Sequence, residues 1–255
     1  MTTTATKITL VTGASRGLGR NTALSIARHG GDVVVTYHSR SDEAQAVVAE
    51  IQALGRKAVA LQLDTGDVAA FAPFAERLCA ALRDTWSRNS IDHLVNNAGH
   101  GDYALIGDTT EAQFDGLVNV HFKGVYFLTQ TLLPLIADGG RIVNLSSGLT
   151  RTSFPGYAVY AAAKGAVEVL TRYMAKELGA RGIAVNTVAP GAIETDFGGG
   201  VVRDNPEINK QFAGLTALGR VGVPDDIGPM IASLLSQDNR WVTAQRIEVS
   251  GGQGI

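Results

Sequence analysis

Ile8-Thr-Leu-Val-Thr-Gly-Ala-Ser-Arg-Gly-Leu-Gly19 joins a short apolar, β-branched run to a turn rich in glycine. The residues that follow place Leu18, Thr22, Ile26 and Ala27 on one side of a helix. Glycines allow a tight turn and the close approach of a phosphate, and a helix N-terminus presents free N–H groups and the positive end of the helix dipole. We therefore expect a strand, a turn and a helix that bind the pyrophosphate of a dinucleotide, although a well-packed turn alone also favours glycine.

Short β-branched runs recur along the chain, separated by segments with helical character. Near-continuous apolar strands joined by helical crossovers are typical of a parallel sheet with helices on both faces. We expect an α/β protein in which residues 1–255 form one single-domain Rossmann fold with a doubly wound, seven-stranded parallel sheet. Ligands bind beyond the carboxyl ends of the strands in such sheets. The predicted strands are Ile8–Val11, Val33–Thr36, Ala58–Leu61, His93–Asn96, Arg141–Leu145, Ala184–Val188 and Arg246–Val249.

Composition narrows the class of partner. The chain has 255 residues, is 45% hydrophobic and carries 22 basic and 24 acidic residues, so its net charge is -2. No block of Lys or Arg is present to attract nucleic acid or an anionic membrane, and a small molecule is the expected partner. Residues 1–7 lack a signal-sequence pattern, and the longest uncharged run, Gly124–Ala137, is too short to span a bilayer. We expect a cytoplasmic protein.

Cysteine and histidine give no sign of a metal or a disulfide. Cys79 is the single cysteine and falls at helical spacing with the apolar residues around it, so we expect a small core residue. The five histidines are scattered without metal-ligand spacing, and we expect no metal. They are His29, His38, His93, His100 and His121.

Ser147, Tyr160 and Lys164 form the pattern that indicates chemistry. The segment from Ala158 to Leu170 is rich in helix formers, so Tyr160 and Lys164, four residues apart, share one helix face. An unperturbed tyrosine titrates near pH ~10, and a neighbouring cation favours the phenolate and lowers that pKa. The pattern predicts proton transfer to or from a carbonyl group. Taken alone, Tyr160 and Lys164 are equally compatible with two solvated residues on an exposed face.

The end of the second predicted strand indicates which dinucleotide binds. A carboxylate there would bind the ribose 2′-hydroxyl of NAD, but the segment Tyr37-His38-Ser39-Arg40 contains no acid. Arg40, and Arg16 in the glycine turn, suit a 2′-phosphate instead. We therefore expect NADP(H), while a solvated Arg40 at the start of the next helix is the alternative.

These motifs together resemble the classical short-chain dehydrogenase/reductase family over essentially the whole chain. The closest likeness is to the branch of β-ketoacyl carrier-protein reductases and NADPH-dependent carbonyl reductases. The resemblance implies a catalytic tetrad of Asn119, Ser147, Tyr160 and Lys164. It also implies a homotetramer formed through the helices around 113–135 and 157–179 and the C-terminal segment. The cofactor-binding residues that it and the turn chemistry imply are Gly13, Ser15, Arg16, Gly17, Leu18, Gly19, Tyr37, His38, Ser39, Arg40, Asp64, Asn97, Ala98, Gly99, Tyr160, Lys164, Pro190, Gly191, Ile193 and Thr195.

Some of these matches have a competing interpretation. Asp64 is equally suited to cap the helix that starts near Asp67. Asn97 can brace neighbouring strands. Asn119 lies in the otherwise apolar helical segment from Phe114 to Leu133, where an amide needs a partner.

The substrate side is read from apolar residues and from one unusual segment. His100, Leu149, Phe154 and Phe197 are the candidate pocket residues, although they could equally be ordinary packing. The segment from about 195 to 215 contains three consecutive glycines, which suit a hinge, so we expect a mobile lid; an ordinary surface loop is the alternative.

The predicted activity is hydride transfer between NADP(H) and a ketone, aldehyde or secondary alcohol, with Tyr160 as the proton donor. A carbonyl reductase is favoured over a β-ketoacyl carrier-protein reductase, because Asp138 stands where a base would dock an acidic carrier, although Arg181 fits a second basic position. A catalytically idle NADP(H)-binding sensor or scaffold is the alternative of another class.

Overall fold

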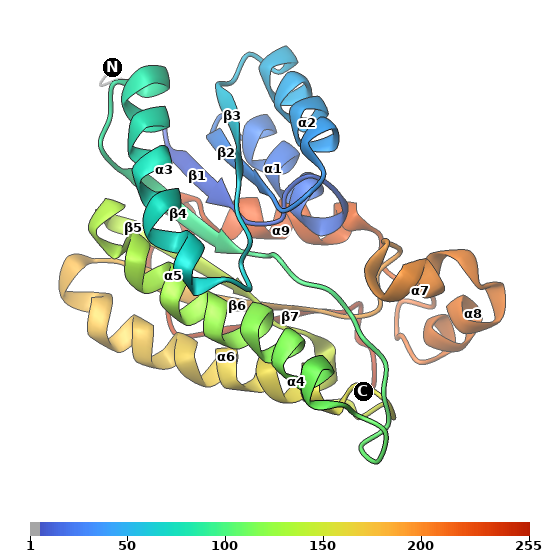
Figure 1. The fold of residues 1–255 in the computed structure, drawn as a ribbon. Helices are drawn as coiled ribbons and strands as arrows, with labels where there is room; N and C mark the ends of the chain where they lie inside the picture. Colours follow the sequence, from blue (N-terminus) through green and yellow to red (C-terminus); the bar gives the residue numbers. More distant parts are fainter. Residues whose placement is uncertain (1–5) are drawn as a thin grey trace.

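The computed structural model describes residues 6–255; residues 1–5, on which part of the signal-sequence expectation rests, lie outside them. The seven predicted strands are confirmed, with ends that differ by a few residues. They form one sheet of parallel strands in the order β3-β2-β1-β4-β5-β6-β7 (Figure 1). The strands are β1 Ile8–Val11, β2 Asp32–Tyr37, β3 Ala58–Gln62, β4 Ile91–Asn96, β5 Ile136–Leu145, β6 Ala184–Pro190 and β7 Arg246–Val249.

The strand order places a crevice at the centre of the sheet. Leu10 of β1 pairs with Val34 of β2 on one side and with Leu94 of β4 on the other. The chain therefore builds outward from β1 in two directions, and the connections after β1 and β4 diverge. This is the switch point at which doubly wound sheets bind ligands, outside the carboxyl ends of the strands.

Helices cover both faces of the sheet. Helices α1, α2 and α9 pack on one face, and α3, α5 and α6 on the other (Figure 1). Each face buries an aliphatic or aromatic cluster, so the sheet is dry on both sides, as a parallel sheet requires. The α-helices are α1 Gly17–Arg28, α2 Ser41–Ala53, α3 Phe71–Trp86, α4 Glu111–Val118, α5 Gly124–Leu132, α6 Ala158–Leu178, α7 Val201–Asp204, α8 Pro206–Gly214 and α9 Pro224–Leu234.

Cys79 is less buried than its spacing predicts. Phe71, Phe74, Leu78 and Leu82 of α3 have no exposed surface, whereas Cys79 is half-buried. The fully buried residues recur every three or four positions and form one stripe. Cys79 lies at the edge of that stripe, so the expectation of a core residue is corrected.

The segment from Phe114 to Leu133 is not one regular helix. Between α4 and α5, residues Asn119–Lys123 form a π-helical turn, in which the N–H of Gly124 donates to the carbonyl of Asn119. A π-turn inserts an extra residue and rotates the side chains that follow it. The side chains after Asn119 are therefore displaced from the directions that a continuous α-helix would give them.

The fifth strand also departs from prediction, because it begins at Ile136 and not at Arg141. Its pairing with β4 shifts register between Ile91 and His93, which pair with Ile136 and Arg141. Residues 137–140 therefore extend the strand through an irregularity instead of preceding it as a loop.

Helices α7 and α8 project from the main body beside the carboxyl edge of the sheet (Figure 1). They follow Gly198, Gly199 and Gly200, whose φ angles are 60°, 76° and 79°. Residues other than glycine rarely adopt three such φ angles in succession, so the shape of this turn explains why three glycines occur here. Among residues 6–255, no helix is both long and apolar enough to cross a membrane.

His93 makes stability depend on pH. It is buried on β4, its Nδ1 lies 3.1 Å from the Thr9 hydroxyl, and burial lowers its pKa to about 4. Since the unfolded histidine binds a proton below pH ~6.5 and the folded one does not, this contribution to stability is complete above that pH and is lost as pH falls towards 4.

The wild-type protein should lose unfolding free energy between pH 7 and pH 5, because only its unfolded state takes up a proton at His93. We predict that His93→Gln makes this loss smaller by roughly 2 kcal/mol. Denaturant unfolding of both proteins at the two pH values measures this. The assignment fails if the two proteins lose the same free energy.

Candidate active site

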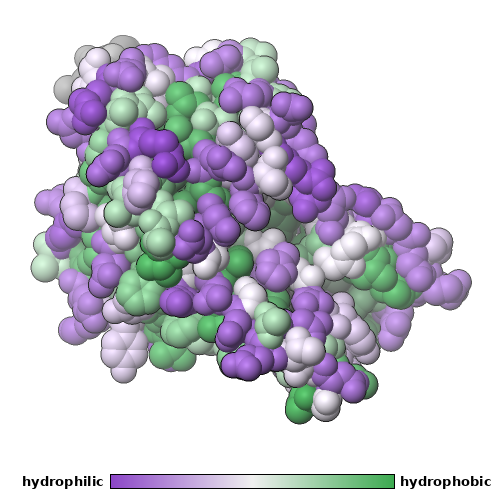
Figure 2. Space-filling view, viewed as in Figure 1, coloured by the Kyte–Doolittle hydropathy of each residue, from purple (hydrophilic) through white to green (hydrophobic). Residues whose placement is uncertain are grey.

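One cleft of about 730 Å³ lies at the carboxyl ends of the central strands. The glycine turn after β1, the ends of β2 to β6 and the segment before α7 line it. Its mouth lies in the recess between the main body and the projecting α7–α8 segment (Figure 2). Every candidate site residue predicted from the sequence lines this cleft except Tyr37 and Asn119.

The glycine turn is built so that side chains would block it. Gly13 has a φ of 62°, and a Cβ there would lie 2.9 Å from the Cα of Ala98. A Cβ on Gly19 would lie 2.3 Å from the carbonyl oxygen of Gly13. Gly17 has a φ of 55°. The three glycines are therefore required by geometry: two for close packing and two for a positive φ.

Thr12 and Asn97 join the ends of β1 and β4. The hydroxyl oxygen of Thr12 accepts the N–H groups of Asn97 and Ala98, each at 2.9 Å. The Asn97 amide returns a bond of 2.8 Å to the Thr12 carbonyl oxygen. Asn97 thus braces neighbouring strands, the alternative that the sequence left open, while it also lines the cleft.

The N-terminus of α1 is free to bind an anion. Its N-cap residue, Arg16, makes no side-chain capping bond, and the first turn carries no acidic residue. The first N–H groups of a helix lack partners within the helix, and the helix dipole places positive charge there. The turn geometry and this open helix end fit the pyrophosphate of a dinucleotide.

The adenosine end of the cleft carries His38, Ser39, Arg40 and Asp64. Asp64 accepts the Gly66 N–H at 2.8 Å and lies 3.5 Å from His38 Nε2. The helix cap that was an alternative role for Asp64 belongs to Asp67, which accepts the Ala69 N–H. Tyr37 is a correction: it packs against the core of the α1–α2 face, because alternate strand residues point to opposite sides.

Arg16 and Arg40 both reach the cleft, and both are paired with acids. Arg40 contacts Glu43, one turn later in α2. Arg16 lies 3.3 Å from Asp196, which also contacts Arg203. Each arginine is about half exposed. Exposed ion pairs contribute little free energy, so a phosphate can replace these carboxylates as the partner of either guanidinium.

The far end of the cleft carries Pro190, Gly191, Ile193 and Thr195. Gly191 donates to the Val249 carbonyl at 3.2 Å, and a Cβ on Gly191 would lie 2.6 Å from Gln253 Oε1. The turn after β6 is therefore packed against the C-terminal segment.

Ser147, Tyr160 and Lys164 meet in the middle of this cleft. Ser147 follows β5, and its Oγ accepts the Leu149 N–H at 3.2 Å. Tyr160 and Lys164 are buried on α6, and Lys164 Nζ donates to the Leu145 carbonyl at 2.7 Å. The Ser147 hydroxyl lies close enough to the Tyr160 phenol to lower its pKa. The spacing in the sequence thus corresponds to one cluster.

Burial reverses the expected pKa of Tyr160. Burial raises the pKa of the Tyr160 phenol to about 12, and the Ser147 hydroxyl opposes this only in part. Burial also lowers the pKa of the Lys164 ammonium to about 7. Lys164 Nζ lies 5.8 Å from the Tyr160 ring centroid. The expectation of a lowered tyrosine pKa is corrected for the protein alone, because burial has the largest effect on this pKa.

His121, two residues after Asn119, lies in the cleft beside Tyr160. Asn119 does not line the cleft, because the π-turn that it opens directs Val120 and His121 there. The His121 ring meets the Tyr160 ring edge-on, with centroids 4.9 Å apart. Its Nε2 lies 2.7 Å from the His100 carbonyl oxygen, so Nε2 carries the proton. Burial, and next the Lys164 charge, lower its pKa to about 2, and its Nδ1 is buried without a partner among the described residues.

The remaining wall of the cleft is apolar and aromatic. Phe197 lies against Tyr160, with ring centroids 5.3 Å apart, and Phe154 lies against Phe212 at the same separation. Every residue that segments 148–157 and 197–212 contribute to the cleft is uncharged. The sequence identified Leu149, Phe154, Phe197 and His100, and it missed Phe212 of α8, whose position depends on how the α7–α8 segment folds.

Among residues 6–255, no group of three or more His, Cys, Asp or Glu side chains could hold a metal ion.

A dinucleotide-shaped turn and a Ser-Tyr-Lys cluster in one cleft define a site of the kind found in nicotinamide-dependent oxidoreductases. A family model described as enoyl-(acyl carrier protein) reductase matches residues 13–253. The chain belongs to the classical short-chain dehydrogenase/reductase family and is an oxidoreductase.

Three similar proteins extend this finding. A hydroxynaphthalene reductase-like protein Arp2 from Metarhizium brunneum is 38% identical, and the match covers 96% of this chain and 94% of that protein. The promiscuous reductase LugOII, which catalyses keto-reduction at C1 during lugdunomycin biosynthesis, is 39% identical with a TM-score of 0.91 and 96% coverage of each chain. The angucycline C-6 ketoreductase LanV, solved with bound NADP, is 35% identical with a TM-score of 0.92, covering 96% of this chain and 95% of that one.

We predict that Gly19→Ala weakens dinucleotide binding at least tenfold, because its Cβ would collide with the Gly13 carbonyl. Gly165→Ala on α6 is the matched control, since a Cβ there has no neighbour within 4 Å. That change is expected to stabilise the helix by up to ~1 kcal/mol and to leave binding unchanged. Fluorescence titration with NADPH measures the affinity of both variants. Equal affinities would contradict the geometry.

Proposed function

We propose that the protein reduces the ketone group of a neutral, planar aromatic compound with NADPH. One observation carries the proposal: Ser147, Tyr160 and Lys164 share a cleft with the glycine turn, and the opposite wall is uncharged and aromatic. Ketoreduction by LugOII and LanV, and the naphthalene-type name of the Arp2 relative, support this class of substrate.

The reduced dinucleotide, when bound, supplies the hydride. Ser147 and Tyr160 hold the carbonyl oxygen of the substrate. Because Ser147 Oγ already accepts the Leu149 N–H, its own proton is free to donate to that oxygen. Tyr160, with a pKa of about 12, is fully protonated at neutral pH and donates the proton as the alkoxide forms.

Lys164 holds the cofactor and supports Tyr160. One of its N–H groups is directed to the Leu145 carbonyl, which leaves the rest of the amine for hydroxyl groups of the nicotinamide ribose. His121 Nδ1 presents a neutral acceptor beside Tyr160.

The preference for NADP(H) over NAD(H) rests on charge at the adenosine end. The segment after β2 offers His38, Ser39 and Arg40 to the cleft, with no carboxylate. Arg16 adds a second guanidinium. The NADP bound to LanV supports the same preference.

The structure weakens the case for a substrate bound to an acidic acyl carrier, because Arg181 is not free to bind the carrier. Arg181 Nε donates to Asp138 at 2.8 Å, and its other nitrogens donate to the Leu133 and Ile136 carbonyls. Its charge and donors are used locally, and an acidic carrier would meet Asp138 as well. This favours a free ketone over a carrier-bound one.

We further propose a cytoplasmic homotetramer. Large apolar side chains are exposed on α4, α5 and α6 and at the C-terminal end, which supports contacts with further copies of the chain. They include Phe114, Tyr126, Val169, Tyr173, Trp241 and Ile255.

The proposal predicts which carbonyl compounds oxidise NADPH. Absorbance assays would compare fused-ring aromatic ketones, quinones, open-chain β-ketoesters and carrier-bound β-ketoacyl groups. We expect the highest kcat/KM with neutral fused-ring ketones, and a fall of at least ~100-fold in kcat for Tyr160→Phe with NADPH affinity retained. Tyr157→Phe, which removes another hydroxyl from the cleft lining just before α6, should reduce kcat far less.

A carrier-bound substrate with the highest kcat/KM would overturn the substrate class. A Tyr160→Phe enzyme with near-normal turnover would overturn the proton-donor role. Silence of the wild-type protein across all the compounds would favour the catalytically idle NADP(H)-binding protein.

Arg16→Ala and Arg40→Ala test the coenzyme preference. A charge-assisted bond to a phosphate is worth about 1.5–3 kcal/mol, so each change should raise the NADPH dissociation constant by roughly tenfold or more and leave NADH binding unchanged. Arg20→Ala is the control, because Arg20 lies in α1, pairs with Glu50 and does not reach the cleft. An unaltered ratio of NADPH to NADH affinity in both variants would refute the role.

A further inference from the structure

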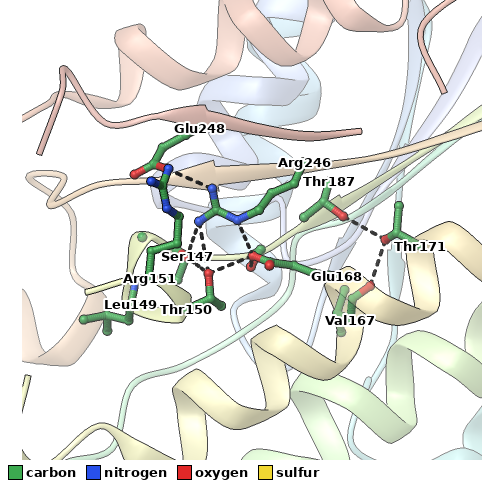
Figure 3. Close-up of polar contacts among 12 residues, drawn as sticks. Ser147, Leu149, Thr150, Arg151, Val167, Glu168, Thr171, Thr187, Arg246 and Glu248 are labelled. Carbon is green, nitrogen blue, oxygen red and sulfur yellow. Dashed lines mark hydrogen bonds and ion pairs between the residues drawn. The ribbon is translucent and has the colours of Figure 1, made fainter. Parts of the chain in front are cut away.

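A cluster of charged and hydroxyl side chains lies behind Ser147, outside the cleft. Glu168 of α6 and Arg246 of β7 face each other at its centre (Figure 3). Glu168 Oε1 accepts three bonds: from Ser146 Oγ at 2.6 Å, from Thr150 Oγ1 at 2.8 Å and from Arg246 Nε at 2.7 Å. We call Glu168 and Arg246 together the Glu168–Arg246 clamp.

Arg246 extends the clamp to the loop that carries Ser147. One of its terminal nitrogens, Nη2, donates to the Thr150 hydroxyl at 3.0 Å and to the Ser147 carbonyl oxygen at 3.4 Å. The other, Nη1, donates to Glu248 at 2.9 Å. The planar guanidinium fixes these directions relative to one another. The clamp therefore ties the Ser147 loop to both α6 and β7.

The clamp is largely removed from water, since the side chains of Glu168 and Arg246 are 15% and 21% exposed. Charged hydrogen bonds are stronger where water is excluded, and loss of one partner leaves the other charge unpaired. Such a pair holds its geometry more firmly than the exposed ion pairs elsewhere on the surface.

Helix α6 does not depend on this clamp for its position. Three residues after Glu168, Thr171 accepts bonds from Thr187 of β6 at 2.8 Å and from Asn144 of β5 at 2.9 Å, and it donates to Val167 (Figure 3). These buried bonds anchor the helix to the sheet. The Ser147 loop, residues 146–152, contains a single 3₁₀ turn after β5. It has fewer backbone hydrogen bonds than helix α6.

We propose that Glu168 and Arg246 are positioning residues, which hold the Ser147 hydroxyl in line with Tyr160. Glu168 lies one helical turn beyond Lys164 and two turns beyond Tyr160, so one rigid helix carries both catalytic groups and the anchor of the serine loop. Neither clamp residue lines the cleft, so they act on it through the loop that carries Ser147. The proposal rests on the proposed function, in which Ser147 holds the substrate carbonyl.

The test is a double-mutant cycle between Arg246→Met and Ser147→Ala. Arg246→Met should lower kcat by roughly 10- to 100-fold, as expected for a misplaced catalytic group, with the NADPH dissociation constant unchanged. In the Ser147→Ala background it should lower kcat by less than about threefold, because the group that it positions is gone. Glu168→Gln, which retains an acceptor oxygen, should lose less activity than Glu168→Ala.

Arg151→Met is the matched control. The Arg151 guanidinium pairs with the same Glu248, at 2.6 Å, but bonds to neither Glu168 nor the Ser147 loop oxygens. It should keep near-normal kcat. Equal losses in the wild-type and Ser147→Ala backgrounds, or an equal loss in Arg151→Met, would overturn the proposal.

Amide hydrogen exchange provides a readout that needs no turnover. Arg246→Met should speed exchange in residues 146–152 and leave α6 unchanged, whereas unchanged exchange in both would refute the clamp. If the wild-type protein reduces no carbonyl compound, the proposed function fails, while the exchange result still decides whether the clamp orders the serine loop.

Discussion

Parallel pairing of β1, β4, β5 and β6 is the constraint on which the site depends. Parallel strands end at the same edge, so the segments that follow them meet although they are far apart in the chain. The glycine turn follows β1, Asn97 follows β4, Ser147 follows β5 and Gly191 follows β6. The Thr12 hydroxyl locks the first two ends together through its bonds to the N–H groups after β4. Reversal of any one of these strands would remove its residue from the cleft.

Burial then sets the chemistry at that edge. Tyr160 and Lys164 are both withdrawn from water, and this favours the neutral form of each. A protonated phenol is the state that a proton donor to a developing alkoxide needs. Oxidation of an alcohol would instead require the phenolate, which the protein alone disfavours at neutral pH. A protonated Tyr160 therefore matches the proton-donor role in the proposed reduction, and the uncharged wall opposite Tyr160 matches a substrate without charge.

The sequence predicted what local patterns control. Seven β-branched runs predicted the strands, and the intervals between Ser147, Tyr160 and Lys164 predicted that these three side chains meet in one cleft. What it missed depends on geometry or on long-range contacts. The π-turn at Asn119 redirects the side chains after it and brings His121 to Tyr160. Neither the pairing of Arg181 with Asp138 nor the contact of Glu168 with Arg246 follows from spacing, because the partners come from separate elements.

The central claim is that the dinucleotide and the Ser147–Tyr160 pair act on one carbonyl carbon within a single cleft. A single-turnover reaction with NADPH carrying two deuterium atoms at C4 of the nicotinamide, and a fused-ring aromatic ketone, tests it most directly. Mass spectrometry of the alcohol should show one deuterium on the carbinol carbon. An alcohol with hydrogen at that carbon, or NADPH consumed without formation of alcohol, would contradict the account.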